Sequence, residues 1–175
     1  MTGPEVAMFK KYLDNASDYS EFGSGGSTCL VNSMQTIKTV VSIENDRDFR
    51  NKVQALCPRC DVRWINTGNT GVYGHVSNNT EMHLWPNYSS ADIGTPDTIL
   101  IDGRFRVACG LQCCIKHPSA TILIHDFTNR PEYHVLMNYM DIVEYVDTLV
   151  CAKVKPNNDL QKIHELYETY KCIQD

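Results

Sequence analysis

The sequence lacks an excess of positive charge: 16 lysines and arginines stand against 21 aspartates and glutamates, and the formal net charge is −5. A general nucleic-acid-binding protein needs a basic surface, so this composition argues against that class. No apolar run approaches the roughly 18 residues of a membrane-spanning helix. The first residues also lack the apolar core of a secretory signal peptide. We therefore expect a cytoplasmic protein that binds neither nucleic acid nor membrane.

The eight cysteines lack the spacing of a zinc site. Cys57 and Cys60 form one C-x-x-C pair, but a structural zinc site needs four ligands, and neither a second pair nor an H-x-x-x-H motif is present. Without a signal peptide, a disulfide framework is not favoured either. We expect most of the thiols to be reduced and packed as small apolar residues in a core. A zinc site and a redox pair at Cys57 and Cys60 are the less favoured alternatives.

Length and pattern predict one α/β domain over residues 1–175. Hydrophobic residues make up 42% of the chain, which suits a globular domain rather than a disordered one. Strand-like and helix-like segments alternate, and the central strands are continuously apolar, which is typical of a mainly parallel sheet covered on both faces. The expected helices cover residues 5–15, 28–35, 46–56, 105–115, 133–138 and about 159–171. The expected strands cover residues 19–22, 39–43, 62–65, 98–101, 120–124, 142–145 and 149–153.

A glycine-rich loop follows the first expected strand and reads EFGSGGST over residues 21–28. Glycine lets a backbone approach a ligand closely, and the N-terminus of the next helix offers free N–H groups. Glu44 ends the next strand, where a carboxylate can accept the ribose hydroxyls of a nucleoside cofactor. The loop has neither the Gly-Lys-Ser/Thr of a Walker loop nor G-x-G-x-x-G, which weakens dinucleotide binding. A plain connecting loop is the alternative.

These segments together resemble the class I S-adenosylmethionine-dependent methyltransferases. The resemblance rests on Glu21 before the loop, the E-x-G-x-G-G-S loop itself and the acidic strand end at Glu44. TPDTILIDGRFRVAC and ATILIHDFTNRPEYH also resemble the fourth and fifth strands of a small subgroup with similar GSGGST, DGRxR and HDF–RPEYH segments. The resemblance covers essentially the whole chain. It implies a Rossmann-like, mainly parallel seven-stranded sheet with an antiparallel C-terminal pair and helices on both faces.

The resemblance also implies where S-adenosylmethionine binds. The glycine loop would line the methionine part of this cofactor, and Glu21 would lie near its amino end. Glu44 would accept the ribose hydroxyls, and Asn45 would approach the adenine, with residues 67–69 as a weaker candidate on that side. The expected cofactor-binding residues are Glu21, Gly23, Ser24, Gly25, Gly26, Ser27, Glu44, Asn45 and Asp102.

Asp102 ends the fourth expected strand in the segment Asp-Gly-Arg-Phe-Arg. A carboxylate at the end of a buried strand is costly unless it is paired, and Arg104 and Arg106 are possible partners. A salt bridge that holds the loop is one interpretation. The other places Asp102 at the methyl-transfer centre as base or metal ligand, because a hydroxyl is a poor nucleophile until its proton is removed or a metal lowers its pKa. Either arginine is a candidate to bind an anionic acceptor group.

His125 and Asp126 follow the fifth strand and are expected at the same sheet edge as Asp102. Some small O-methyltransferases that this chain resembles hold Mg²⁺ or another divalent metal with such an aspartate pair. Catechol-type members have Asp-Asn where this chain has Asp126-Phe127. Without a metal, His125 is the candidate general base, because an unperturbed histidine titrates near neutral pH. A His–Asp hydrogen bond that stiffens the loop is the alternative.

We expect catalytic roles for Asp102, Arg104, His125 and Asp126, with Asp102 and Asp126 as metal ligands. The acceptor-binding candidates are Trp85, Tyr88, Arg106, Arg130 and His134. Core packing is the alternative for the two aromatic residues, and a structural role is favoured for His134.

The resemblance favours O-methylation of a sugar or glycan hydroxyl, because the subgroup looks like glycan-modifying enzymes, including ones of large algal viruses. The polar segment 66–90 also suits a polyol. A catechol or another small hydroxylated molecule, a nucleotide-sugar or NAD-dependent enzyme, and a non-catalytic cofactor-binding module remain alternatives. At 175 residues the chain leaves little for a separate acceptor domain. We therefore also consider a second subunit, or a larger glycosylation enzyme of which this domain is part.

Overall fold

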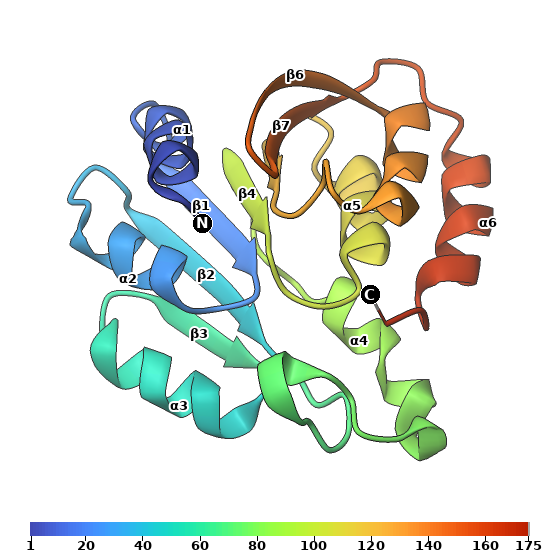
Figure 1. The fold of residues 1–175 in the computed structure, drawn as a ribbon, viewed down its shortest axis with the longest axis horizontal. Coiled ribbons are helices and arrows are strands. Elements are labelled where there is room, and N and C mark those ends of the chain that lie inside the picture. The colour runs from blue at the N-terminus through green and yellow to red at the C-terminus, as the bar shows by residue number, and fades with distance from the viewer. Residues whose placement is uncertain (175) are drawn as a thin grey trace.

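Seven strands form one sheet in the computed structural model, which describes residues 1–174 (Figure 1). The strand order is β3-β2-β1-β4-β5-β7-β6. The strands are β1 (Asp18–Phe22), β2 (Thr39–Glu44), β3 (Asp61–Trp64), β4 (Thr98–Ile101), β5 (Thr121–Ile124), β6 (Met140–Val146) and β7 (Leu149–Val154). The first five run parallel, whereas β7 pairs antiparallel with both β5 and β6. The predicted mainly parallel sheet with an antiparallel C-terminal pair is confirmed.

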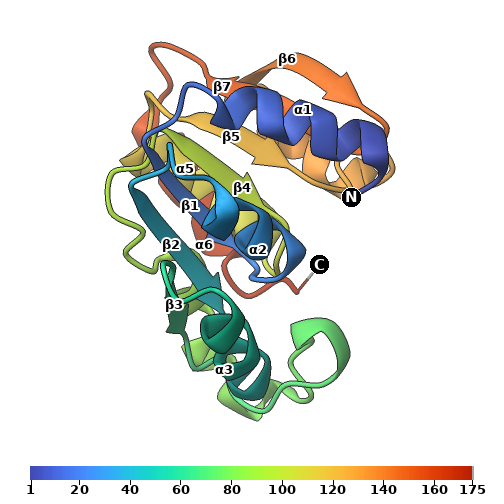
Figure 2. The same ribbon diagram turned by 90° about the vertical axis from the view of Figure 1, so that its left-hand side faces the viewer.

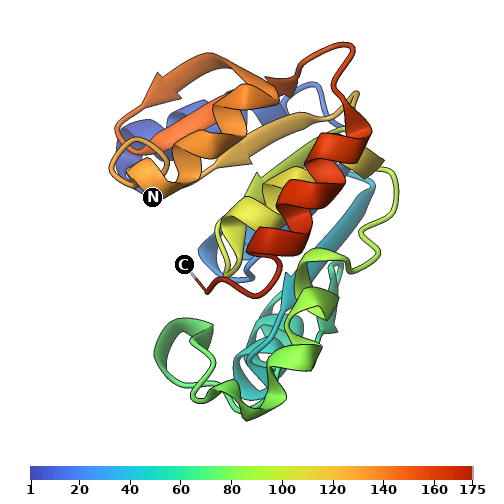
Figure 3. The same ribbon diagram turned by 90° about the vertical axis from the view of Figure 1, so that its right-hand side faces the viewer.

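Helices cover both faces of the sheet, as predicted. The helices α1 (Gly3–Leu13), α2 (Gly26–Ser33) and α3 (Arg47–Leu56) lie on one face (Figure 2). The other face carries α4 (Pro86–Ser89), α5 (Arg106–Lys116), α6 (Leu160–Tyr170) and the 3-10 helix η3 (Pro131–Asn138) (Figure 3). Within residues 1–174, no helix is both long enough and apolar enough to cross a membrane.

The two covered faces explain why β4 and β5 are apolar at successive positions. Side chains alternate along a strand, so a strand covered on both sides buries every residue. In β4, Ile99 and Ile101 pack in the apolar cluster beneath α5 and α6. Leu100 packs in the cluster beneath α1, α2 and α3. The sequence Thr-Ile-Leu-Ile, which occurs in both β4 and β5, therefore contributes side chains to the apolar clusters on both faces of the sheet.

Capping side chains set the helix boundaries. Thr2 and Glu5 form a reciprocal capping box, and α1 accordingly begins at Gly3, two residues earlier than expected. Asp46 accepts a hydrogen bond from the Phe49 N–H at the start of α3. Asp159 caps α6 by accepting from two backbone N–H groups. Each cap satisfies donors that have no partner within the helix itself.

The segment between β3 and β4 is irregular but ordered by buried aromatic residues. It contains the 3-10 helices η1 (Val72–Gly74) and η2 (Asn79–Leu84), followed by α4. Trp85 and Tyr88 are 3% and 1% exposed and pack on Phe105, with ring centroids 5.7 and 5.8 Å away. Core packing of these two rings places the segment over the carboxyl ends of β1, β2 and β4.

Candidate active site

A cavity of about 800 Å³ lies at the carboxyl ends of the parallel strands. This volume is in the range of small-molecule sites. Its walls include the glycine loop after β1, the end of β2 and the residues that follow β4 and β5. The lining residues expected from the sequence are Gly23, Ser24, Gly25, Gly26, Glu44, Asn45, Tyr88, Asp102, Arg104, Arg106, His125 and Asp126. Ser27 lines a smaller adjoining cavity of about 290 Å³.

Glu44 forms one edge of the large cavity. One carboxylate oxygen accepts the backbone N–H and the hydroxyl of Ser24, at 3.2 and 2.8 Å. The other oxygen accepts the N–H groups of Asn45 and Asp46, at 2.8 and 2.9 Å. Burial raises the pKa of Glu44 despite these hydrogen bonds. Of the four donors to Glu44, only the Ser24 hydroxyl belongs to a side chain, which can rotate away. A ligand diol can therefore replace the Ser24 hydroxyl at the carboxylate.

Asn45 joins this edge to the irregular segment above it. Its amide nitrogen donates to the Thr67 hydroxyl at 3.0 Å and to the Gly74 carbonyl at 2.9 Å. Gly74 leaves room for that contact, because a Cβ there would lie 2.6 Å from Asn45 Oδ1. Thr67, the weaker candidate for the adenine side, is fully buried at this junction. The two hydrogen bonds of Asn45 therefore position the segment that overhangs the cavity.

The structure places Glu21 beneath the glycine loop rather than on the cavity wall. Its carboxylate is fully buried and accepts hydrogen bonds from the hydroxyls of Tyr19, Ser27, Thr28 and Ser42. Burial raises the pKa of Glu21 although all four hydroxyls favour its charged form. Thr28 also accepts the Gly25 N–H at 2.8 Å. In this arrangement Glu21 holds the loop and the first turn of α2 together from below.

Gly23 is required by a close backbone approach. Its φ is +96°, and a Cβ there would lie 2.6 Å from both N and Cα of Gly103. Gly103 follows β4, so the loops after two neighbouring strands touch through their backbones. A Cβ on Gly103 would in turn lie 2.1 Å from the Tyr88 hydroxyl. The two glycines let these loops meet on the cavity floor.

Asp102, His125 and Asp126 converge at the other end of the cavity. His125 Nδ1 lies 2.9 Å from Asp102 Oδ1 and 3.6 Å from Asp126 Oδ1. One ligand atom from each of the three residues lies within 4.8 Å of the others. All three side chains are half-buried and line the cavity. The expected meeting of the two strand ends is thus realised with His125 between the carboxylates.

Arg106 binds both carboxylates from below. Its guanidinium lies 2.9 Å from Asp126 Oδ2 and 3.3 Å from Asp102 Oδ1. Arg106 is only 3% exposed, and it also donates to the Gly103 carbonyl at 3.0 Å. Burial opposes its charge, but the two aspartates and Tyr133 raise the pKa of Arg106 above its usual value. A buried guanidinium in this position neutralises the strand ends. Its ion pair with Asp102 is the salt bridge that the sequence offered as one interpretation, the other being an acceptor contact.

Glu5 is a member of this cluster that the sequence did not reveal. Its Oε2 lies 3.2 Å from His125 Nε2, and its Oε1 accepts both the N–H and the hydroxyl of Thr148, at 2.9 and 2.7 Å. Burial would raise the pKa of Glu5, but hydrogen bonds from Thr148 and Thr2 lower it to about 2. The one available signal was its place in a capping box, which gives no indication of a partner 120 residues away.

His125 therefore has a carboxylate at each ring nitrogen. An imidazole can donate from both nitrogens only when it is protonated. Burial alone would lower the pKa of His125, but its bond to Asp102 and the three surrounding carboxylates raise it. The geometry favours an imidazolium that bridges Asp102 and Glu5 over a neutral base. Because the pKa of His125 is higher in the folded protein than in the unfolded chain, protonation of His125 stabilises the fold. This stabilisation is complete below the pKa of the unfolded chain, near 6.5, and is lost as the pH rises through the pKa of the folded protein.

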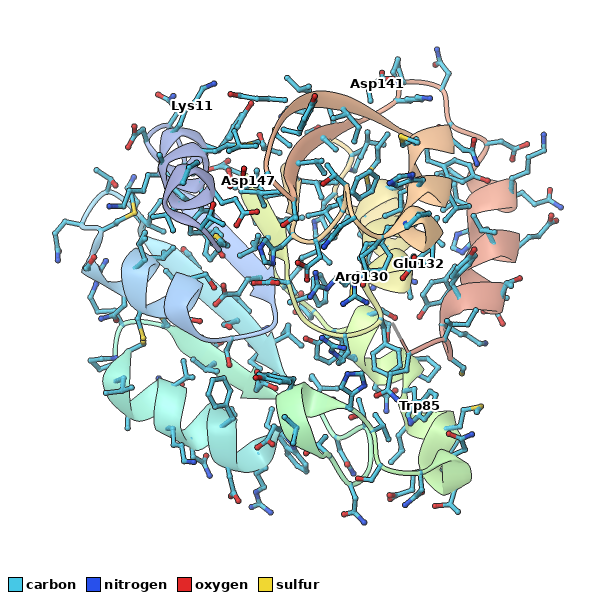
Figure 4. All side chains as sticks on the ribbon, in the orientation of Figure 1. Lys11, Trp85, Arg130, Glu132, Asp141 and Asp147 are labelled. Atoms are coloured by element: carbon cyan, nitrogen blue, oxygen red, sulfur yellow. The ribbon has the colours of Figure 1, made fainter. Side chains whose placement is uncertain are left out.

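The remaining predicted acceptor residues lie outside the cavity. Trp85 packs at α4 in the core, and Arg130 lies beside Glu132 at the start of η3 (Figure 4). His134 contacts the Phe127 carbonyl at 3.0 Å. Each is held by contacts within its own loop or core, which spacing along the chain could not show. Of the five candidates, Arg106 and Tyr88 line the cavity.

The cavity rim carries aromatic residues that the sequence analysis did not select. Phe49 is 43% exposed on the first turn of α3, and Tyr73 is 87% exposed on η1. Both line the cavity, and the Phe49 ring lies beside Gly25. Exposed aromatic side chains are costly in water, so these two rings offer apolar surface to a ligand. Arg104 lies nearby and contacts His75 at 3.0 Å, which ties the loop after β4 to this segment.

Solved structures that are similar to this chain include methyltransferases and a methyltransferase-like protein. A methyltransferase-like protein from Silicibacter pomeroyi is 25% identical, with a TM-score of 0.82 and 95% of each chain covered. An O-methyltransferase from Bacillus cereus, in complex with S-adenosylhomocysteine, is 13% identical with a TM-score of 0.56, covering 89% of this chain and 82% of that one. No protein-family model and no curated protein matches the sequence.

A third neighbour shows that the fold does not choose the acceptor atom. An N-methyltransferase from Bradyrhizobium japonicum, in complex with S-adenosylhomocysteine, is 12% identical with a TM-score of 0.58, covering 88% of this chain and 86% of that one. The chain thus has the Rossmann-like fold of these methyltransferases. Acceptor choice must be argued from the site itself.

Proposed function

We propose that this chain is an S-adenosylmethionine-dependent O-methyltransferase that acts on a hydroxyl of a sugar or glycan. The observation that carries the proposal is a single cavity with two different ends. Glu44 lies at the end of β2, Asp102, His125 and Asp126 lie at the ends of β4 and β5, and the glycine loop after β1 lies between these two groups. Such a cavity can hold a nucleoside cofactor and an acceptor in contact, which is the main requirement of a transfer reaction.

The residues present fit S-adenosylmethionine. Gly23 lets the glycine loop lie directly against the Gly103 backbone, and Glu44 presents a carboxylate edge suited to ribose hydroxyls. Phe49 and Tyr73 supply apolar surface near Glu44 for a base. When bound, this cofactor supplies an electrophilic methyl group. The chain's own residues would orient it along the glycine loop with its reactive end towards Asp102.

Asp102 is the residue that we assign to proton removal from the acceptor. Its side chain is 28% exposed, faces the cavity and has an ordered imidazole on one oxygen. An alcohol must lose its proton as the new bond forms, and a carboxylate within hydrogen-bonding reach can take it. The positive charges of His125 and Arg106 keep Asp102 in place. His125 then acts as a positioning residue rather than as the base.

The same cluster also fits a divalent cation, which is the second candidate mechanism. Two carboxylates and one imidazole within 4.8 Å form a mixed oxygen and nitrogen donor set. Such an ion, held by Asp102, His125 and Asp126, would supply a Lewis acid that lowers the pKa of the acceptor hydroxyl. It would have to displace the proton of His125 and share the carboxylates with Arg106. Methyl transfer that stops in EDTA and returns with Mg²⁺ or Mn²⁺ would favour this alternative.

The polarity of the acceptor end supports a sugar over a catechol. Asp102, His125 and Asp126 surround that end with groups that bind hydroxyls. The exposed aromatic rings of the cavity belong to other segments: Phe49 lies beside Gly25, and Tyr73 precedes Gly74, whose carbonyl accepts from Asn45. A planar phenol would benefit from an aromatic wall, whereas a polyol benefits from several hydrogen-bonding groups.

Calorimetry with S-adenosylhomocysteine, NAD and a nucleotide sugar tests the proposed function. We expect binding of S-adenosylhomocysteine alone, at least tenfold weakened in Glu44→Gln, because the amide cannot accept both ribose hydroxyls as a carboxylate does. Methyl transfer from labelled cofactor is then measured on matched panels of sugars and catechols, and we expect labelled sugars. Binding of NAD alone would refute the proposed methyltransferase activity. Binding of S-adenosylhomocysteine together with methyl transfer only to catechols would refute the proposed sugar acceptor.

Changing Glu5 to glutamine should move the pH dependence of methyl transfer. Glu5 raises the pKa of His125 by its negative charge, so its loss lowers that pKa. Because a deprotonated His125 can no longer bridge two carboxylates, we expect kcat to fall on the alkaline side. In Glu5→Gln this alkaline fall should begin roughly one pH unit lower. The pH profile of kcat and an NMR titration of His125 measure the shift.

Glu144→Gln is the matched control for Glu5→Gln. Glu144 also fastens α1 to the sheet, through Lys11 and Tyr12 at 2.6 and 2.7 Å, but it does not contact His125. We expect its pH profile to match that of the wild type. Identical profiles in both variants would show that Glu5 only fastens α1. If kcat instead rises with pH through the pKa of His125, then His125 is the base.

A further inference from the structure

Two cysteine thiols from different helices are in contact on the α1–α3 face of the sheet. Cys29 lies in the first turns of α2, and Cys57 caps the C-terminus of α3. Their sulfur atoms are 3.1 Å apart, although 28 residues separate them in the chain. Cys29 is exposed and Cys57 is buried, and the structure contains both as free thiols. Nothing in methyl transfer uses either of them.

We propose that Cys29 and Cys57 form a reversible disulfide under mild oxidation, and that this link ties α2, the helix that follows the glycine loop, to α3. A disulfide bond is about 2.05 Å long, so the sulfurs must approach by only about 1 Å. Exposure of Cys29 gives an oxidant access to one sulfur of the pair. This inference is independent of the proposed acceptor and of the methyl-transfer chemistry.

Cys60 is the competing partner for Cys57, because the two form the C-x-x-C pair of the sequence. Its thiol is directed elsewhere: Cys60 Sγ lies 3.9 Å from the Thr28 carbonyl and 3.8 Å from Asn32 Oδ1. These are polar atoms of α2 rather than the sulfur of Cys57. Spacing in the sequence therefore favours Cys57–Cys60, whereas contact in the fold favours Cys29–Cys57.

Glutathione disulfide is a sufficient oxidant for the reaction. The exposed Cys29 thiolate attacks one of its sulfurs, forms a mixed disulfide and releases one glutathione. The Cys57 thiolate then attacks Cys29 Sγ and releases the second glutathione, so two protein thiols and one glutathione disulfide give one protein disulfide and two glutathiones. Burial and the neighbouring Cys29 raise the pKa of Cys57 to about 12, which makes this second step faster at higher pH.

The link would act on the helix that supports the cofactor loop. Thr28, next to Cys29, donates to the buried Glu21 and accepts the Gly25 N–H. A covalent bond one residue away restrains the same turn. The bond would also close a chain segment of roughly 30 residues, which restricts the unfolded state. We therefore expect oxidation to raise the thermal midpoint while the folded structure is kept.

The test treats the full-length protein with glutathione disulfide at pH 8 and maps its peptides without reduction. We expect a Cys29–Cys57 linked peptide, removed by dithiothreitol, and a rise in Tm of roughly 5–10 °C. Cys29→Ser should lose both, and it is a safe variant because Cys29 is exposed. Cys172→Ser, which removes a partly exposed thiol in contact with the Met82 carbonyl, should keep both.

Three results would overturn the proposal. One is a Cys57–Cys60 peptide in place of the linked Cys29–Cys57 peptide. Another is a Cys29–glutathione adduct that persists without resolution by Cys57. The third is a Tm that is the same in the oxidised and reduced wild type, or that rises equally in Cys29→Ser.

Discussion

Asp102→Asn should lower kcat for methyl transfer by about 10²–10⁴-fold, the usual contribution of a positioned acid or base. Asparagine has nearly the same shape, and its oxygen can still accept the hydrogen bond from His125 Nδ1 that Asp102 accepts at 2.9 Å. It cannot take a proton from an acceptor hydroxyl. The loss should therefore appear in kcat, while the dissociation constant for S-adenosylhomocysteine changes by less than about tenfold. Single-turnover transfer and calorimetry measure the two quantities.

Asp97→Asn is the control for this experiment because it lies next to the other end of the same strand, β4. Asp97 accepts the N–H groups of Ser17 and Asp18, which asparagine can also accept, and it is far from the cavity lining. We expect its kcat to match the wild type. A comparable fall in both variants would point to a general structural effect. Full activity in Asp102→Asn would remove Asp102 from proton transfer.

Gly23→Ala should destabilise the protein and weaken cofactor binding together. The new Cβ would lie 2.6 Å from the Gly103 backbone, and the residue must keep a φ of +96°. A non-glycine residue in that region costs roughly 1–3 kcal/mol, and forced repacking against a backbone adds a similar amount. We therefore expect a loss of about 3 kcal/mol or more and a fall in Tm of about 10 °C. Both loops line the cavity, so affinity for S-adenosylhomocysteine should fall as well.

Gly26→Ala, three residues further along the chain, should not destabilise the protein. A Cβ at Gly26 meets nothing within 4 Å, and this residue begins α2. Alanine is the better helix former, so Tm should stay unchanged or rise slightly. Thermal unfolding of the two variants side by side checks the argument. An equal fall in Tm in both variants would mean that the close approach of Gly23 to Gly103 is not the reason why glycine is required at position 23.

Both loops of the cluster hold a non-glycine residue in the left-handed region. Phe105 has a φ of 56° just before α5, and Asp126 has a φ of 58° just after β5. Such conformations are rare for a bulky side chain and cost free energy. Packing against Trp85 and Tyr88 supports Phe105, and the Arg106 guanidinium supports Asp126. The strain is thus located where the loops aim Asp102 and Asp126 into the cavity.

Much of the fold was predictable because its causes are local. Continuous apolar runs such as Thr98–Ile101 require burial on both faces, and that pattern alone indicates a parallel sheet covered by helices. Capping residues such as Asp46 and Asp159 mark helix starts within a few positions. Strand ends at one sheet edge also follow from topology, which is why Glu44 and Asp102 could be assigned to a ligand site before any contact was known.

The tertiary structure alone decided which charged groups face one another. Glu5 reaches His125 across 120 positions, and Arg106 binds Asp126 in addition to Asp102, the partner that the sequence had offered. Neither the Glu5–His125 pairing nor the Arg106–Asp126 pairing has a period, a cap or a spacing that a sequence could display. Each depends on how helices α1 and α5 dock on the sheet, and docking is set by packing over the whole core. The sequence therefore determined the sheet and the edge at which we expect a ligand to bind, while the fold decided the partners of His125 and of its carboxylates.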